Sequence, residues 1–207
     1  MTAYELKYIF SSISDIINKN KDYLIELDAQ NGDGDLGLSM SNGFKAVSDF
    51  LNINEEKDIG KVFIKMSSVF NEVSPSSLGT ILSFSMIGMA KSLKGKEEAG
   101  IAEFSNALEN GVKLIMEKAN SKLGEKTILD SLYPAVETLK NNQNLEHKEL
   151  FKKAFESASA GSESTKNMKA VHGRASYYGE KSIGILDGGS VVGKLIFEGI
   201  YHYYSNK

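Results

Sequence analysis

Cysteine is absent from this chain of 207 residues, which excludes a disulfide scaffold, a thiolate zinc site and a cysteine nucleophile. No apolar run reaches about 18 residues, so no membrane-spanning helix is expected. Basic residues (24) do not outnumber acidic ones (27), and a net charge of −3 gives no basic surface for nucleic acid. The first ten residues lack the apolar block of a signal peptide. We therefore expect a soluble cytoplasmic protein.

Proline is also scarce, and only Pro75 and Pro134 occur. Apolar residues recur every three or four positions, as on one face of a helix. These stripes cover residues 6–17, 40–51, 59–70, 78–93, 101–115, 129–139, 150–158 and 192–200. Pro134 is expected to kink its helix or to lie near its first turns. Eight amphipathic helices with mostly short connections predict an all-α protein, an antiparallel up-and-down barrel or bundle in one domain over residues 1–207.

Acidic residues cluster between the first two stripes. Asp28, Asp33 and Asp35 fall within eight residues, among glycines at positions 32, 34 and 37. Like charges held this close repel one another unless they are solvated or neutralised by a cation. Carboxylate oxygens are ligands that Mg²⁺ prefers. The segment therefore predicts a divalent metal site.

A polar turn in which Asp35 caps the next helix is the alternative for this segment. A calcium EF-hand loop counted from residue 31 does not match. Leu36 stands where that loop needs glycine, and Asn42 stands where it needs a bidentate glutamate.

Three other segments are candidates for binding phosphate. Hydroxyl residues in the segment 73–80 precede a helical stripe, where free amides hold phosphate or where serine simply caps the helix. In the segment 124–130, Lys126 either reaches a phosphate or is solvated. The segment 172–190 is a long, glycine-rich gap without a helical stripe, and Arg174 in it either binds phosphate or is a surface loop residue.

Two smaller patterns complete this survey. Thr127 and Asp130 resemble a capping box with aspartate in place of glutamate. His147, His172 and His202 are far apart in the sequence, and none lies near the acidic cluster. A histidine metal site or a Ser-His-Asp triad has no local support.

Together these segments resemble the nucleotide-binding L subunit of dihydroxyacetone kinase, the DhaL or Dak2 domain family, in order and over nearly the whole chain. Leu27-Asp28 with Gly32-Asp33-Gly34-Asp35-x-Gly37 resembles the metal motif of the family. Residues 124–127 resemble its Gly-Asp-Lys-Thr motif, and residues 173–184 resemble its C-terminal signature. The family fold is an eight-helix antiparallel barrel, which agrees with the count of stripes.

The resemblance implies that Asp28, Asp33 and Asp35 hold two Mg²⁺ ions that bridge to the phosphates of ADP or ATP. It implies no catalytic residue beyond this metal site. The nucleotide contacts that it implies are Gly37, Leu38, Ser39, Ser74, Ile128 near the base, Arg174, Asp187, Gly188 and Gly189.

The activity implied is phosphoryl transfer to dihydroxyacetone or a related short keto-sugar that a separate K subunit holds. In the phosphoenolpyruvate-dependent branch of the family, an M-type phosphotransferase subunit recharges the bound nucleotide. The chain departs from the family at Leu36, where histidine is usual, at residues 71–75, where a glycine-rich loop is usual, and at Gly188, where proline is usual. Two alternatives remain, which are a non-catalytic nucleotide-sensing module and a Mg²⁺-dependent phosphatase using the same site.

Overall fold

The computed structural model describes residues 1–207, and helices make up most of it. The α-helices are α1 (Ala3–Lys19), α2 (Lys21–Asp28), α3 (Leu36–Ile53), α4 (Ile59–Val73), α5 (Ser77–Leu93), α6 (Ile101–Ala119), α7 (Leu129–Asn141), α8 (His147–Ser164) and α9 (Gly188–Ser205). Two 3₁₀ segments, η1 (Thr165–Asn167) and η2 (Arg174–Ser182), lie between α8 and α9. The β-structure is a single bridge between Thr2 and Glu98.

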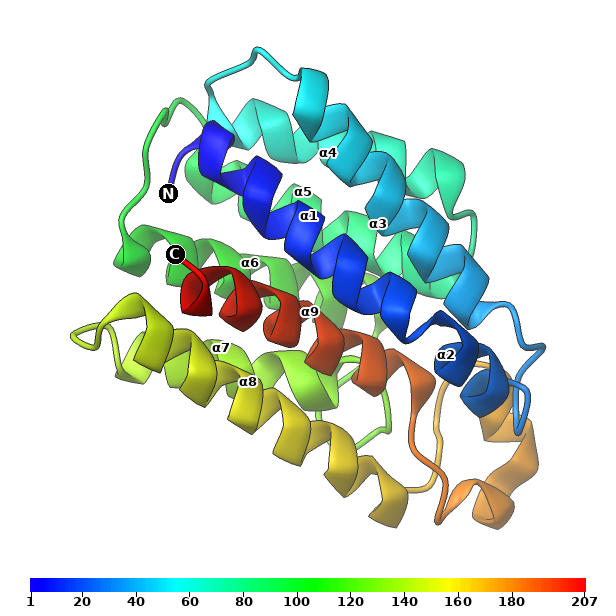
Figure 1. The fold of residues 1–207 in the computed structure, drawn as a ribbon. Coiled ribbons are helices and arrows are strands. Elements are labelled where there is room, and N and C mark those ends of the chain that lie inside the picture. Colours follow the sequence, from blue (N-terminus) through cyan, green and yellow to red (C-terminus); the bar gives the residue numbers. More distant parts are fainter.

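The eight long helices form a closed ring. Each packs against the next long helix along the chain, and α1 packs against α9, which closes the barrel (Figure 1). The predicted all-α up-and-down barrel is therefore confirmed. The short α2 continues the line of α1 and packs on α3 at one end of the barrel.

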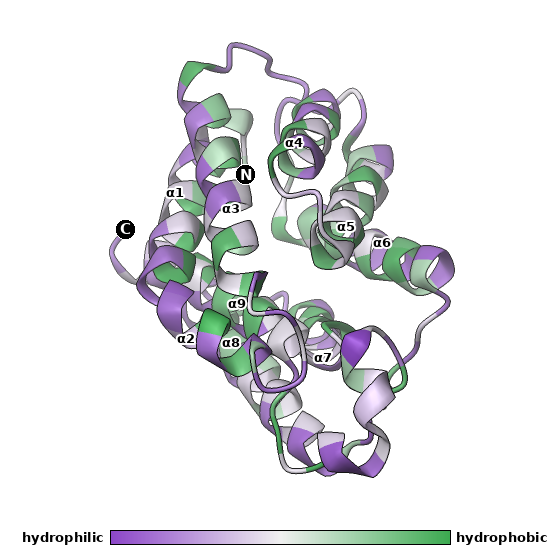
Figure 2. Ribbon diagram, turned by 90° about the vertical axis from the view of Figure 1, so that its right-hand side faces the viewer, coloured by the Kyte–Doolittle hydropathy of each residue, from purple (hydrophilic) through white to green (hydrophobic).

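The apolar stripes line the inside of this ring. Buried apolar side chains form one continuous core of 44 residues. Every residue of the predicted stripes in α1, α3, α4 and α7 is buried, and in Figure 2 the long helices carry both hydrophobic and hydrophilic residues. In α5, however, Leu78 and Ile81 are only partly buried. These two side chains lie at the end of the barrel where the site is built.

Two local predictions need correction. The separate helix α2 was not predicted, because it has only eight residues and buries only Leu24 and Leu27, too few for a stripe. The segment 172–190 is not free of helical structure, since η2 lies in it and α9 already begins at Gly188. The 3₁₀ segment η2 is interrupted at Gly179, where φ is +54°. Its sequence therefore shows no apolar periodicity from which a helix could be predicted.

Pro134 lies in the second turn of α7. Proline has no N–H, so the carbonyl of Asp130 four residues earlier has no helical donor there. Gly161 of α8 packs directly on this carbonyl, and a side chain at position 161 would overlap it. Glycine therefore lets α8 approach the first turn of α7 closely, beside the functional site.

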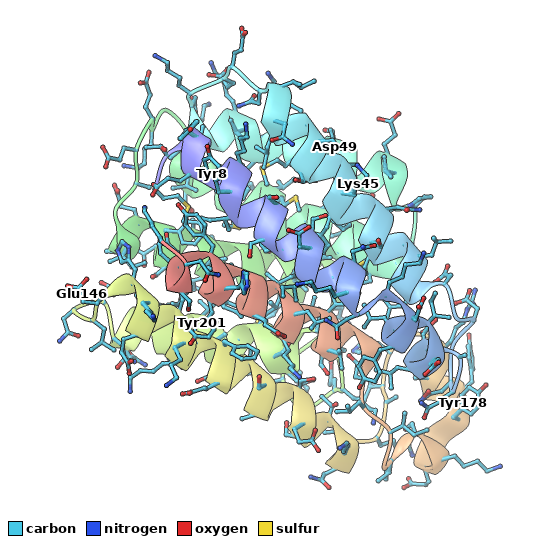
Figure 3. All side chains as sticks on the ribbon, viewed as in Figure 1. Tyr8, Lys45, Asp49, Glu146, Tyr178 and Tyr201 are labelled. Atoms are coloured by element: carbon cyan, nitrogen blue, oxygen red, sulfur yellow. The ribbon has the colours of Figure 1, made fainter.

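The two ends of the barrel differ in what they carry. Both chain termini lie at one end, where the amino group of Met1 donates to Ala99 O at 2.6 Å and Lys207 pairs with Glu5 at 2.7 Å. Glu146 lies at this end, and Tyr178, a residue of η2, lies at the other (Figure 3). None of the helices combines the length and the apolar character needed to cross a membrane.

Candidate nucleotide and metal site

The acidic turn, residues 28–35, brings the three predicted carboxylates together. Asp28 is the last residue of α2, Asp33 lies in the connection, and Asp35 immediately precedes α3. One oxygen from each carboxylate lies within 4.8 Å of the others. The amide of Gly34 donates to Asp28 Oδ2 at 2.8 Å, and the φ of +76° at Gly34 is one that glycine adopts without strain. The local sequence thus folds the turn around its own carboxylates.

Asp35 occupies the N-cap position of α3, but its side chain accepts no hydrogen bond from the helix. The capping alternative is therefore wrong, and the carboxylate of Asp35 faces the cluster instead. Burial raises the pKa of Asp35, and the neighbouring charges of Asp33 and Asp28 raise it further. A cation would relieve this repulsion. Three hard oxygen donors in this arrangement fit Mg²⁺.

Arg174 forms an ion pair with Asp33, which places its guanidinium beside the acidic turn. Both side chains are exposed, and both line the same cleft. Arg174 is therefore held at the mouth of the site, although it lies 141 positions away from Asp33 in the sequence.

A cleft of about 430 Å³ opens beside the acidic turn. Eight of the twelve predicted site residues line it, namely Asp28, Asp33, Asp35, Ile128, Arg174, Asp187, Gly188 and Gly189. The other four, Gly37, Leu38, Ser39 and Ser74, are not among its lining residues. The cleft gathers the start of α3, the start of α5, the start of α7 and the start of α9.

The four predicted residues outside the lining lie just behind it. Ser74 is fully buried, and its hydroxyl is 2.6 Å from the hydroxyl of Ser39, which in turn donates to Ser76 at 2.9 Å. Ser76 lines the cleft and caps α5 by accepting from the amide of Gly79, so the capping interpretation of this segment is confirmed. Gly37 is buried against α2, whereas Leu38 is exposed.

The cleft also has an apolar wall, of which the sequence analysis had predicted only Ile128. Leu78 and Ile81 of α5, Ile128 before α7 and Leu186 before α9 form it. Leu36 stands where histidine is usual in the family that the sequence resembles. It is buried and packs against Gly188. The cleft therefore combines charged and apolar lining residues.

Lys126 matches neither of the two interpretations that the sequence allowed. Only 2% of it is exposed, so it is not solvated, and its ammonium group bonds to backbone carbonyls of the segment 165–185. Burial lowers the pKa of Lys126, against a smaller raising effect of Asp187. Of the capping box predicted with Thr127, one half is present, because the carboxylate of Asp130 accepts from the amide of Thr127 at 2.8 Å.

Two further groups border the cleft. Asp187 caps α9 by accepting from the amide of Ser190 at 2.6 Å. Burial raises the pKa of Asp187 to about 7, although the Ser190 amide acts in the opposite direction. His172 lines the cleft, with Nε2 2.7 Å from a carboxylate oxygen of Glu125. No sequence pattern indicated this pair, because its residues are 47 positions apart.

Comparison with known proteins agrees with the geometry. The family model described as the DAK2 domain matches residues 30–202. The chain belongs to the DAK2 domain family. Among DAK2 relatives, the ADP-binding subunit DhaL of PEP-dependent dihydroxyacetone kinase 2 from Listeria innocua is 30% identical, over 88% of this chain and 86% of the relative. The corresponding DhaL subunit from Escherichia coli K12 is 30% identical over 85% of each chain. Triokinase/FMN cyclase of Rattus norvegicus is 28% identical over the whole of this chain, which spans 36% of that enzyme.

Solved structures show the same fold. The dihydroxyacetone kinase of C. freundii superimposes with a TM-score of 0.76 at 20% identity, over 95% of this chain and 34% of that one. The same enzyme in complex with AMP-PNP and Mg²⁺ superimposes with a TM-score of 0.74. The DAK2 chain described here therefore spans about a third of the length of that larger enzyme.

Proposed function

We propose that this chain is the nucleotide-binding phosphotransfer subunit of a kinase acting on dihydroxyacetone or a related short keto-sugar. One observation carries the proposal, which is a single cleft that joins a cluster of three carboxylates to an apolar wall. A nucleotide with bound metal ions has the matching character, because its polyphosphate is charged and its base is flat and largely apolar. The DhaL relatives are named as ADP-binding subunits, which supports the same ligand.

In this proposal Asp28, Asp33 and Asp35 hold two Mg²⁺ ions, which supply positive charge for the phosphates of ADP or ATP. Arg174 offers a planar guanidinium to a phosphate oxygen. The first residues of α9, Gly188 and Gly189, line the cleft and present the positive end of an 18-residue helix. The phosphates would therefore lie between the acidic turn and α9.

The base would lie against Ile128 and the remainder of the apolar wall. Gly37, Leu38, Ser39 and Ser74 would then act from behind the lining, with the paired hydroxyls of Ser39 and Ser74 fixing the position of Ser76. Direct contact of these four residues with the nucleotide remains a prediction.

Phosphoryl transfer needs charge neutralisation and in-line placement more than covalent help from the protein. The residues of this cleft fit that requirement, because they orient and neutralise, and none is a nucleophile paired with a base. The sugar would be held by a separate K-type subunit at the exposed mouth beside Arg174. A phosphoenolpyruvate-dependent system would add an M-type subunit that recharges the nucleotide. We place this assembly in the cytoplasm.

Isothermal titration with Mg·ADP tests the binding site. The wild-type chain should bind, and Asp33→Asn should weaken binding by roughly 100-fold, since it removes a charged ligand. Asp15→Asn is the matched control, because Asp15 is exposed on α1 and does not line the cleft. Absence of binding by the wild type, or equal binding by both variants, would reject the proposal.

A transfer assay then separates kinase from the alternatives. Wild-type chain, Mg·ATP, dihydroxyacetone and a K-type subunit should produce the phosphorylated sugar. Tight nucleotide binding without transfer would favour a sensing module. Release of inorganic phosphate from dihydroxyacetone phosphate without ADP would favour a phosphatase.

A further inference from the structure

Lys126 is a buried cation with an unusual number of partners. Its Nζ lies 2.8 Å from Thr165 O, 3.2 Å from Met168 O, 2.8 Å from Ser182 O and 2.5 Å from Ile185 O. An ammonium group has three N–H donors. With four carbonyls around it, no donor is left for a phosphate, so Lys126 acts on the protein itself.

The four acceptors belong to one stretch of chain. We call residues 165–187 the cover segment, since it runs along the cleft and includes η2, which begins at Arg174. Lys126 contacts the start of this segment at Thr165 and Met168 and its end at Ser182 and Ile185. The stretch that carries Arg174 therefore begins and ends at the same ammonium group.

The cover segment has little apolar attachment of its own. Only Thr165, Ala170 and Ser182 are buried in it, and Ala170 alone among them is apolar. Ile185 and Leu186, at its end, are partly buried and pack against the core. Tyr177 is 89% exposed, and Tyr178 and Ile183 also face solvent. Because residues 166–184 bury so little apolar surface, polar bonds must hold this part of the segment in place.

The neighbours of Lys126 add to this attachment. We call residues 122–127 the anchor loop. Its Glu125 accepts from the amide of Val171 at 3.4 Å through the backbone, and its carboxylate pairs with His172 at 2.7 Å. The anchor loop thus also contacts residues 171 and 172, which lie in the chain between the two parts of the cover segment that Lys126 bonds.

The anchor loop is itself held in a conformation that directs Lys126 inward. Lys126 has a φ of +62°, a left-handed conformation that is unfavourable for a residue with a side chain. The buried carboxylate of Asp130 accepts from the amides of Gly124 at 2.7 Å and Thr127 at 2.8 Å, on both sides of Lys126. These bonds maintain the unfavourable backbone at that residue.

We propose that Lys126 is a positioning residue that fixes the cover segment, so that Arg174 is already placed at the phosphate end of the cleft before the nucleotide arrives. This inference rests on the proposed function only for the identity of the ligand. The anchoring itself is a property of the unliganded chain, so the two are testable separately.

Hydrogen exchange of the unliganded protein tests the anchoring. In Lys126→Met, amides of residues 165–187 should exchange about tenfold faster at short labelling times, at which amides of α1 and α4 stay protected as in the wild type. Lys122→Met is the matched control, because Lys122 lies in the same loop but is exposed. Unchanged exchange in the cover segment would overturn the proposal.

A double-mutant cycle on Mg·ADP affinity tests the link to Arg174. Lys126→Met should weaken binding about tenfold in the wild-type background and less than about twofold in an Arg174→Ala background. Equal losses in both backgrounds would show that Lys126 acts independently of Arg174 and would overturn the proposal. If the wild type does not bind Mg·ADP, the proposed function fails, and hydrogen exchange still decides the anchoring.

Ser182→Ala provides a second variant should Lys126→Met fail to fold. It removes the hydroxyl that accepts from the Ala170 amide at 3.0 Å within the cover segment and leaves Lys126 in place. Exchange in the cover segment should rise by a smaller factor, and the affinity loss should again disappear in the Arg174→Ala background. An affinity loss with no change in exchange would contradict the inference.

Discussion

The acidic turn and Lys126 border the same cleft, yet their charges are satisfied in opposite ways. The carboxylates of Asp33 and Asp35 are exposed. Within the turn, the backbone amide of Gly34 donates a hydrogen bond to the carboxylate of Asp28. Lys126 is buried, and backbone carbonyls surround its ammonium group. A group whose hydrogen bonds are complete within the fold maintains structure, whereas a cluster with spare oxygens is available to a ligand.

This difference predicts that removing each charge will affect a different property of the protein. Loss of a satisfied buried charge should destabilise the fold, and loss of a crowded exposed charge should change binding instead. The following expectations concern stability and run from the largest effect to the smallest.

Lys126→Met should lower the free energy of unfolding by about 3 kcal/mol, because it leaves buried carbonyls without a donor. Urea denaturation followed by circular dichroism measures the change. Lys122→Met should stay within about 0.5 kcal/mol of the wild type. A loss of less than about 1 kcal/mol in the free energy of unfolding of Lys126→Met would contradict the view that Lys126 maintains the fold and the acidic turn does not.

Gly161→Ala should destabilise by about 1–3 kcal/mol, even though alanine favours helices, because the new methyl group overlaps the carbonyl of Asp130. The displacement would reach the start of α7, where Asp130 holds the anchor loop. Ser159→Ala, on the same helix, is the control and should be neutral or slightly stabilising. Thermal unfolding of both variants checks this, and equal midpoints would refute the close approach.

Asp187→Asn should change how stability depends on pH. The folded-state pKa of Asp187 is raised to about 7, so between the ordinary value of 3.8 and that pKa the folded state binds more protons than the unfolded state. The wild type should therefore lose stability relative to Asp187→Asn as pH rises from 5 to 8, on the order of 1 kcal/mol. Asparagine also caps helices, so the bond from Ser190 is retained.

Urea titrations of both proteins at several pH values measure this dependence. Asp130, Lys126 and Asp28 are the charged groups that act on Asp187, and they are unchanged in the variant. A constant difference across the pH range would show that Asp187 keeps an ordinary pKa.

Asp33→Asn should have the smallest effect on stability, within about 0.5 kcal/mol of the wild type, because its pair with Arg174 is exposed. The same variant should lose most of its affinity for Mg·ADP. Chemical denaturation measures the free energy of unfolding, and isothermal titration calorimetry of the same sample measures the affinity for Mg·ADP. A destabilisation above about 1 kcal/mol would mean that the acidic turn, like Lys126, supports the fold.

The sequence predicted those structural features that depend on residues close together in the chain. Helices followed from apolar periodicity, and the acidic turn followed from three aspartates and glycines within one short segment. Those features need no knowledge of tertiary contacts.

The features that the sequence did not predict depend on contacts between segments that are far apart in the chain. Lysine is usually solvated, so the burial of Lys126 becomes visible only when residues 165–185 fold around it. Leu78 and Ile81 read as ordinary core residues, because only the arrangement of α5 beside the cleft exposes them there. Asp35 occupies the cap position that its type favours, but its side chain makes no cap bond and lies with Asp28 and Asp33, which is a feature of the folded turn.

The position of the two termini has a practical consequence. Met1 and Lys207 lie at the end of the barrel opposite α2 and η2 (Figure 1). A fluorescent label or an affinity handle joined at either end would emerge on the far side of the molecule from the cleft. Surface immobilisation through such a handle would therefore leave the mouth facing the bulk solution, ready for ligand and for a second protein together.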